Sequence, residues 1–153
     1  MKYAQDIADA TQEIFSSMLM LDVDPGDPFL RDDSKLLNGI SGIIGLAGEV
    51  KGLLAIHLPN KAAQDITTAF LGMDVEEINE DVCDAVGELA NMLGGCIKTI
   101  LDPGGSNVQI SMPSAIYGEE YAVDCLTDSE SVTVPFTFNA QTFMVELQIS
   151  QKS

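Results

Sequence analysis

The chain has 153 residues, 46% of them hydrophobic, and its 24 acidic and 7 basic side chains give a formal net charge of −17 at pH 7. Its length suits one folded domain with a sizeable core, and its apolar content is that of a globular protein rather than a disordered one. So acidic a chain repels phosphate backbones and anionic lipids, which argues against nucleic-acid and membrane partners.

The first predicted element is an amphipathic helix over residues 5–21, in which Ile7, Ile14 and Phe15 recur at helical spacing. It ends at residues 22–28 (DVDPGDP), because proline cannot continue a helix. No long apolar segment follows the lysine near the N-terminus, and the chain contains no run of about 18 apolar residues. We therefore expect a cytoplasmic protein with no targeting peptide and no membrane span.

Two segments rich in isoleucine and leucine follow, at residues 38–47 and 52–58, and the short linker between them predicts an antiparallel hairpin. The second segment carries His57, the only histidine, so a Ser-His-Asp triad could be built only around this residue. We interpret it as a sheet-end histidine without a catalytic role. A helix over residues 60–71 should then be capped by Asn60 and terminated by Gly72.

The most informative segment is a predicted helix over residues 79–101, which Asn79 can cap and which ends before the breaker sequence DPGG. Spacings of three and four residues place its apolar side chains on one stripe, made of Val82, Ala85, Val86, Leu89, Leu93, Cys96, Ile97 and Ile100. The opposite face carries Asp84, Glu88, Asn91, Gly95 and Lys98. A carboxylate and an amide, Glu88 and Asn91, therefore lie one helical turn apart.

Three glycines lie on or beside this polar face, at Gly87, Gly94 and Gly95. Each costs about 0.5–1 kcal/mol relative to alanine inside a helix, a cost that makes sense where something must approach the helix closely. An ordinary surface helix shows the same polar stripe, however. Gly94 and Gly95 also fit a kink or tight packing within the fold, and the pattern alone leaves these interpretations open.

The last third of the chain alternates polar and apolar residues, which predicts strands at residues 107–112, 120–126, 131–138 and 142–149, the last two joined by a short turn at 139–141. The expected fold is α+β: one domain spanning residues 1–153, with about six mainly antiparallel strands and about three helices packed on the sheet. Cys83, Cys96 and Cys125 show no metal-ligand spacing, so we expect no metal site.

The pair Glu88 and Asn91 limits the chemistry that the polar face can perform. Neither side chain is a nucleophile suited to ester cleavage without a base or a metal. An amide both donates and accepts hydrogen bonds, so Asn91 can hold a water in line with a phosphoryl group. Glu88 is suited to pair with a lysine of a partner. The pair would therefore act on a substrate that brings its own metal and lysine.

The spacing D-x-x-x-E-x-x-N, whose glutamate and asparagine lie in the phrase GELANMLGG, resembles the signature helix of the CheC/CheX/FliY family of chemotaxis phosphatases. The resemblance covers nearly the whole chain in order, including the glycine-rich hairpin GIIGLAGEVKGLLAIHLP and a proline, Pro113, some twenty residues after Asn91. The single signature helix is similar to the CheX branch of the family, whereas the CheC branch has two such helices.

The resemblance implies a phosphatase acting on the phosphoaspartate of a CheY-type receiver domain, with Asn91 orienting the attacking water and Glu88 engaging a receiver lysine. It further implies that the Mg²⁺ belongs to the receiver, that this chain carries no cofactor of its own, and that two copies pair into a homodimer. Partner-contact roles are expected for Asp84, Gly87, Gly94, Gly95 and Lys98. The alternative is a non-catalytic module that only binds a receiver, or a scaffold related to the flagellar switch; the presence of both Glu88 and Asn91 favours catalysis.

Overall fold

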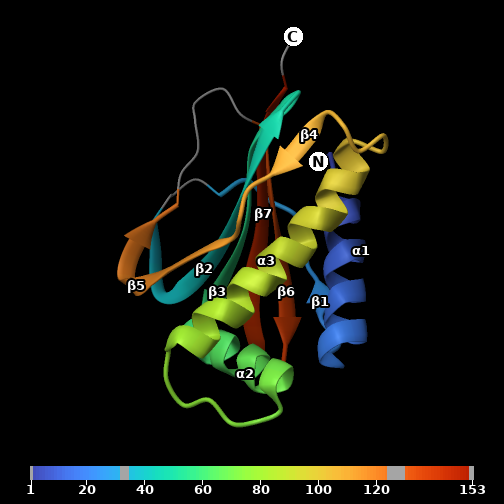
Figure 1. The fold of residues 1–153 in the computed structure, drawn as a ribbon. Coiled ribbons are helices and arrows are strands. Elements are labelled where there is room, and N and C mark those ends of the chain that lie inside the picture. Colours follow the sequence, from blue (N-terminus) through green and yellow to red (C-terminus); the bar gives the residue numbers. More distant parts are fainter. Residues whose placement is uncertain (1, 32–34, 124–129, 152–153) are drawn as a thin grey trace.

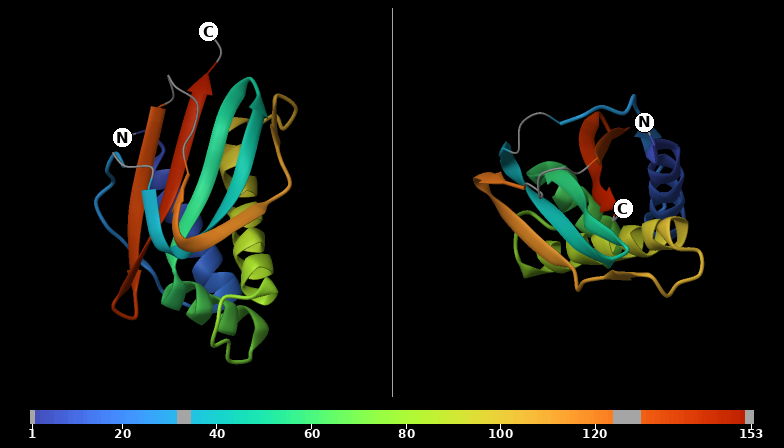
Figure 2. Two further views of the ribbon diagram at one scale, coloured as in Figure 1. Left: turned by 90° about the vertical axis from the view of Figure 1, so that its left-hand side faces the viewer. Right: turned by 90° about the horizontal axis from the view of Figure 1, so that it is seen from above.

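A twisted seven-stranded antiparallel sheet carries all of the helices on one face (Figures 1 and 2). The computed structural model describes residues 2–31, 35–123 and 130–151. The strands are β1 (Asp24–Pro25), β2 (Lys35–Gly48), β3 (Val50–Pro59), β4 (Val108–Ile110), β5 (Ser114–Ala122), β6 (Glu130–Phe138) and β7 (Gln141–Gln151). Their order across the sheet is β1-β6-β7-β3-β2-β4, and β5 also pairs with β2. The α+β prediction is thus confirmed.

The predicted hairpins of the sheet are both present. Strands β2 and β3 pair from Leu46 opposite Gly52 to Gly39 opposite Pro59. Their turn needs glycine at position 48, where φ is 109° and an added Cβ would collide with the carbonyl group of Asn107. Strands β6 and β7 are joined at Asn139 and Ala140, both with positive φ, which is the geometry that matches the twist of a two-residue hairpin.

The helices are α1 (Ala4–Ile14), α2 (Asn60–Leu71) and α3 (Glu80–Leu101), with a π-helical segment, η1 (Phe15–Leu19), continuing α1. The cap predicted for α2 is wrong, because Pro59 occupies the N-cap position and Asn60 is already helical without a side-chain cap. The fixed φ of proline takes the chain directly from β3 into the helix. Gly72 ends α2 as predicted, with φ of 71°.

Two strands differ from the sequence prediction. The segment predicted as a strand at 120–126 begins earlier, since β5 runs over Ser114–Ala122; residues 124–126 lie outside the described part of the chain. The two-residue strand β1, beside β6, was not predicted at all. Every side chain of β5 is exposed or half-buried, so this edge strand lacks the clear alternation that marks a strand with one buried face.

The core lies between the sheet and its helices. Phe15 of η1 stacks on Phe143 of β7 with ring centroids 5.1 Å apart, and Phe143 in turn stacks on Phe136 of β6 at 5.3 Å. Figure 1 shows α3 crossing the sheet diagonally between α1 on one side and β5 on the other. Within the described residues, none of the helices is both long and apolar enough to cross a membrane.

Candidate functional site

The helix α3 is fixed in place by a cap and by an apolar stripe. The side-chain Oδ1 of Asn79 accepts a hydrogen bond from the backbone N–H of Val82 at 3.1 Å, as predicted. Glu80 and Asp81 occupy the first turn, where carboxylates interact favourably with the helix dipole. The predicted stripe is buried against the sheet except for Cys96 and Ile100, which are half-buried. One face of α3 is thereby held rigidly against the sheet.

The opposite face of α3 presents the predicted pair. Glu88 and Asp84 are exposed and Asn91 is half-buried, on successive turns of the helix. Neither Glu88 nor Asn91 forms a hydrogen bond or ion pair with another described side chain. Both groups therefore keep their hydrogen-bonding capacity for water or for a partner.

A surface hollow adjoins Glu88 and joins α3 to the start of β5. It is lined by Cys83, Asp84, Gly87, Glu88, Pro113, Ser114 and Ala115. An added Cβ at Gly87 would lie 3.8 Å from Cβ of Pro113, an ordinary van der Waals distance, so the edge strand packs beside the helix here without requiring a glycine. The sequence resemblance had pointed to Pro113, but no pattern in the sequence showed that Ser114 and Ala115 would share a hollow with Glu88.

The other predicted contact residues divide into two groups. Gly95 has open space where a side chain would stand, and the side chain of Lys98 is half-buried one turn further along. Gly94 differs from the expectation, because it is buried and faces β2. A Cβ at this position would lie 3.0 Å from Cγ2 of Ile44. Packing within the fold therefore accounts for the small size of Gly94, and the space it leaves is filled by Ile44 rather than by a partner.

The neighbouring glycines give a matched test of this difference. Gly94→Leu should lower the free energy of unfolding by about 1–3 kcal/mol, because the new side chain overpacks the contact with Ile44. Gly95→Leu, in open space, should raise it by a few tenths to about 1 kcal/mol through better helix propensity. Urea unfolding of both variants measures the difference, and equal stabilities would contradict the assigned packing of Gly94.

The side chains that could bind a metal are scattered. Among the described residues, no group of three or more histidine, cysteine, aspartate and glutamate side chains is placed to hold an ion. Cys83 and Cys96 are free thiols, and burial together with nearby carboxylates raises the pKa of each. Cys125 lies outside the described residues.

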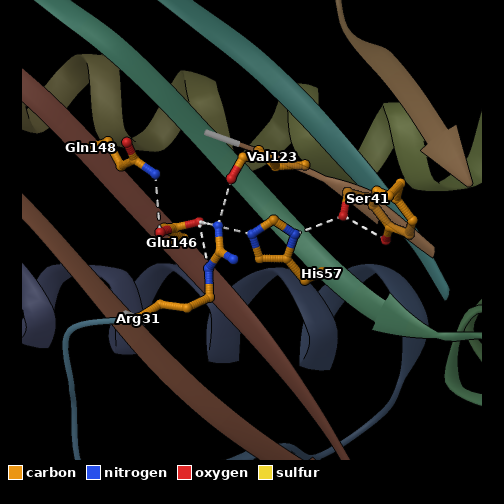
Figure 3. Close-up of polar contacts among 7 residues, drawn as sticks. Arg31, Ser41, His57, Val123, Glu146 and Gln148 are labelled. Atoms are coloured by element: carbon orange, nitrogen blue, oxygen red, sulfur yellow. Dashed lines mark hydrogen bonds and ion pairs between the residues drawn. The ribbon is translucent and has the colours of Figure 1, made fainter. Parts of the chain in front are cut away.

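A buried polar network lies on the sheet face away from the helices (Figure 3). His57 of β3 bridges Ser41 and Glu146, with Nδ1 2.6 Å from the Ser41 Oγ and Nε2 2.9 Å from the Glu146 Oε1. The guanidinium of Arg31 donates to the same Glu146 oxygen at 3.0 Å and to the carbonyl of Val123 at 2.8 Å. Sequence reasoning missed this network, since its members come from five separate segments of the chain.

The distances in this network are those of a serine–histidine–carboxylate triad, but the serine is unsuitable as a nucleophile. Ser41 is 0% exposed, in the middle of β2, and its Oγ is already hydrogen-bonded to both His57 and the Tyr121 hydroxyl, the latter at 2.8 Å. A substrate carbonyl has no access to it. The network instead satisfies the hydrogen-bonding groups of His57 and its buried polar neighbours.

Comparison with known sequences identifies the class of protein to which this fold and this exposed helix face belong. A family model described as chemotaxis phosphatase CheX matches residues 40–137, which is more than half of the chain and includes all of α3. The chain belongs to the CheX family of chemotaxis phosphatases.

Individual relatives agree with this assignment. The CheY-P phosphatase CheX of Thermotoga maritima is 24% identical over 112 residues, covering 72% of each chain. The crystal structure of the chemotaxis protein CheX from Desulfovibrio desulfuricans superposes with a TM-score of 0.86 at 28% identity, covering 98% of this chain and 100% of that one. The CheX-CheY-BeF3-Mg²⁺ complex from Borrelia burgdorferi contains a similar chain, with a TM-score of 0.84, 25% identity, and coverage of 98% and 99%.

Proposed function

We propose that this chain hydrolyses the phosphoaspartate of a CheY-type receiver domain in chemotaxis signalling. The observation that carries the proposal is the pair of exposed Glu88 and half-buried Asn91 on the face of α3 that the sheet leaves uncovered. Membership of the CheX family supplies the substrate class, and the Borrelia relative was crystallised with CheY.

In this proposal, Asn91 positions the water that attacks the phosphoryl group. Its amide can accept a hydrogen bond from the attacking water through Oδ1 and donate one through Nδ2, which fixes the water in line with the phosphorus–oxygen bond that breaks. Phosphoryl transfer needs little more from a protein than positioning and charge compensation, so a single well-placed amide has a large effect. The half-buried position of Asn91 limits the directions in which its amide can point.

In this proposal, Glu88 makes the contact that docks the receiver domain. An exposed carboxylate repels a phosphoryl group but forms a charge-assisted hydrogen bond with an ammonium group, so it is suited to a lysine at the receiver's active site. Asp84 supports the same contact from one turn earlier, while Gly87, Gly95 and Lys98 form the surroundings against which the receiver lies. In this proposal Mg²⁺ arrives with the receiver substrate, and two copies of the chain form a homodimer.

The proposal is tested by adding a substoichiometric amount of the chain to a CheY-type receiver carrying a ³²P-labelled phosphoaspartate. We expect loss of label from many receivers for each copy of the chain. A chain that binds the receiver without accelerating the loss would instead be the non-catalytic module. Light scattering of the chain alone tests the dimer separately.

Receiver binding tests the role of Glu88. Glu88→Ala should weaken the affinity for a receiver loaded with BeF₃⁻ and Mg²⁺, and Glu88→Lys should weaken it further through repulsion of the receiver lysine. The free energy of unfolding should stay within about 0.5 kcal/mol, because the position is exposed. Glu49→Lys, in the exposed β2–β3 turn, makes the same change in net charge and should leave affinity nearly unchanged. Equal receiver affinities of wild type and Glu88→Lys would contradict the docking role assigned to Glu88.

A further inference from the structure

The edge of the sheet next to α3 contains a β-bulge. Strand β4 pairs with β2 in a register that ends at Leu46 opposite Ile110, and β5 resumes pairing at Ile43 opposite Ser114. Two residues of β2 therefore face three residues, 111–113, on the edge strand. An extra residue of this kind bends a strand and changes the direction of its side chains, and such bulges occur often beside active sites.

Ser111 holds the bulge to β2. Its backbone N–H donates to the Gly45 carbonyl at 2.9 Å, and its Oγ accepts from the Gly45 N–H at 2.8 Å. The same hydroxyl donates to the carbonyl of Met112 at 2.9 Å. The hydroxyl thus takes the place of a missing ladder carbonyl and fixes the backbone of the next residue, which a side chain without a hydroxyl cannot do.

The bulge lies beside the polar face of α3. Ile44, opposite the bulge, faces Gly94, and Gly42, which pairs with Ala115 just beyond the bulge, faces Val86 and Ala90. This stretch of β2 is therefore level with the turns of α3 that contain Asn91. Pro113, the last residue of the bulge, lies in contact with α3 at Gly87. Between Ser111 and Pro113, both restrained, the Met112 side chain is 87% exposed. An apolar side chain is thus presented to solvent by a restrained backbone, one residue before Pro113, which lines the same hollow as Glu88.

We propose that Met112 is an apolar contact for the receiver that sets its affinity, and that Ser111 is the residue that positions it. This inference rests on the function proposed above. The acidic surroundings of Glu88 supply attraction to a lysine but little binding energy, whereas a desolvated apolar contact contributes to affinity directly. Methionine suits this use because its flexible, polarizable side chain adapts to the surface that it meets. Gly95, with open space above it, leaves room for the receiver on the same side.

The experiment compares four variants in binding of a BeF₃⁻- and Mg²⁺-loaded CheY-type receiver and in steady-state turnover of the phosphorylated receiver. Met112→Gln should raise Kd and KM about ten-fold, the size of one lost interface contact, with kcat within about two-fold of wild type. Ser111→Ala should change Kd and KM in the same direction, and Ser111→Thr, which keeps the hydroxyl, should restore them. Met20→Gln, equally exposed at 87% but at the end of η1, is the control and should match wild type.

The outcomes separate this inference from the function on which it rests. If wild type accelerates dephosphorylation but Met112→Gln keeps its Kd and KM, the inference fails while the phosphatase proposal stands. A loss of kcat alone in Met112→Gln would also overturn it, as would a change in oligomeric mass without a change in receiver affinity. If wild type neither binds nor dephosphorylates the receiver, both proposals fail together.

Discussion

Replacing Asn91 with alanine is expected to lower kcat for receiver dephosphorylation by about 100-fold or more, the usual effect of losing a group that positions a reactant or stabilises a transition state. The remaining side chains cannot substitute for it, because a carboxylate such as Glu88 repels the phosphoryl group that the water must attack. Fold stability should change little, since Asn91 lies on the polar side of α3 and makes no hydrogen bond to another described side chain.

Two controls make the Asn91 result specific. Receiver affinity, measured with the BeF₃⁻-loaded domain, should be nearly that of wild type, because the docking contact is assigned to Glu88. Thr99→Ala, an exposed change two turns further along the same helix, should leave kcat unaffected. If Asn91→Ala retains more than about a third of wild-type kcat, well outside the expected range, the amide does not position the water.

Replacing Glu146 with alanine is expected to be the most destabilising of these substitutions, at about 3–5 kcal/mol, because it leaves charged or polar groups buried without their carboxylate. Glu146 is 2% exposed and accepts hydrogen bonds from Arg31, His57 and Gln148. Such a loss is a large part of the 5–15 kcal/mol that holds a typical domain folded. Urea unfolding measures it.

The control is Glu120→Ala, which breaks the exposed pair with Lys35 at 2.6 Å. Both side chains of that pair are more than half exposed, so its loss should cost less than about 1 kcal/mol. Comparable losses in the free energy of unfolding of the two variants would contradict the larger contribution assigned to the buried Glu146.

The same network predicts an acid dependence of stability. Burial by itself would raise the pKa of Glu146, but hydrogen bonds from His57 and Arg31 outweigh it and hold the pKa below its ordinary value. Because the folded-state pKa is the lower one, the stabilisation is complete above the unfolded-state pKa and is lost as the pH falls through the folded-state value. Wild type should therefore lose more stability in acid than Glu146→Ala does, and parallel pH profiles would contradict this.

Local signals explain why α3 could be predicted from the sequence. Its cap, acidic first turn, apolar stripe and terminating DPGG all lie within one segment, so Asn79, Glu88 and Asn91 could be placed without knowledge of the rest of the chain. The β2–β3 hairpin was predictable for the same reason. The family resemblance then added the substrate class, which no local pattern contains.

Features that depend on distant segments could not be predicted. Gly94 looked like part of the polar face, because its contact with Ile44 is set by how far α3 is rotated on the sheet. The exposed edge strand β5 has no buried face to create an alternating pattern. Glu146 is 89 residues from His57 in the chain, and neither residue carries a sequence signal for the other. The bulge at 111–113 appears only when the registers of β4 and β5 against β2 are compared.

The central claim is that the uncovered face of α3 catalyses phosphoryl hydrolysis on a receiver. Its most direct test is the single-turnover loss of ³²P from a phosphorylated CheY-type receiver mixed with a saturating excess of the chain in the presence of Mg²⁺. We predict that wild type accelerates the loss well beyond the receiver's own rate and that Asn91→Ala, although bound, does not. A rate equal to that of the receiver alone, with binding confirmed in the same sample, would contradict the account.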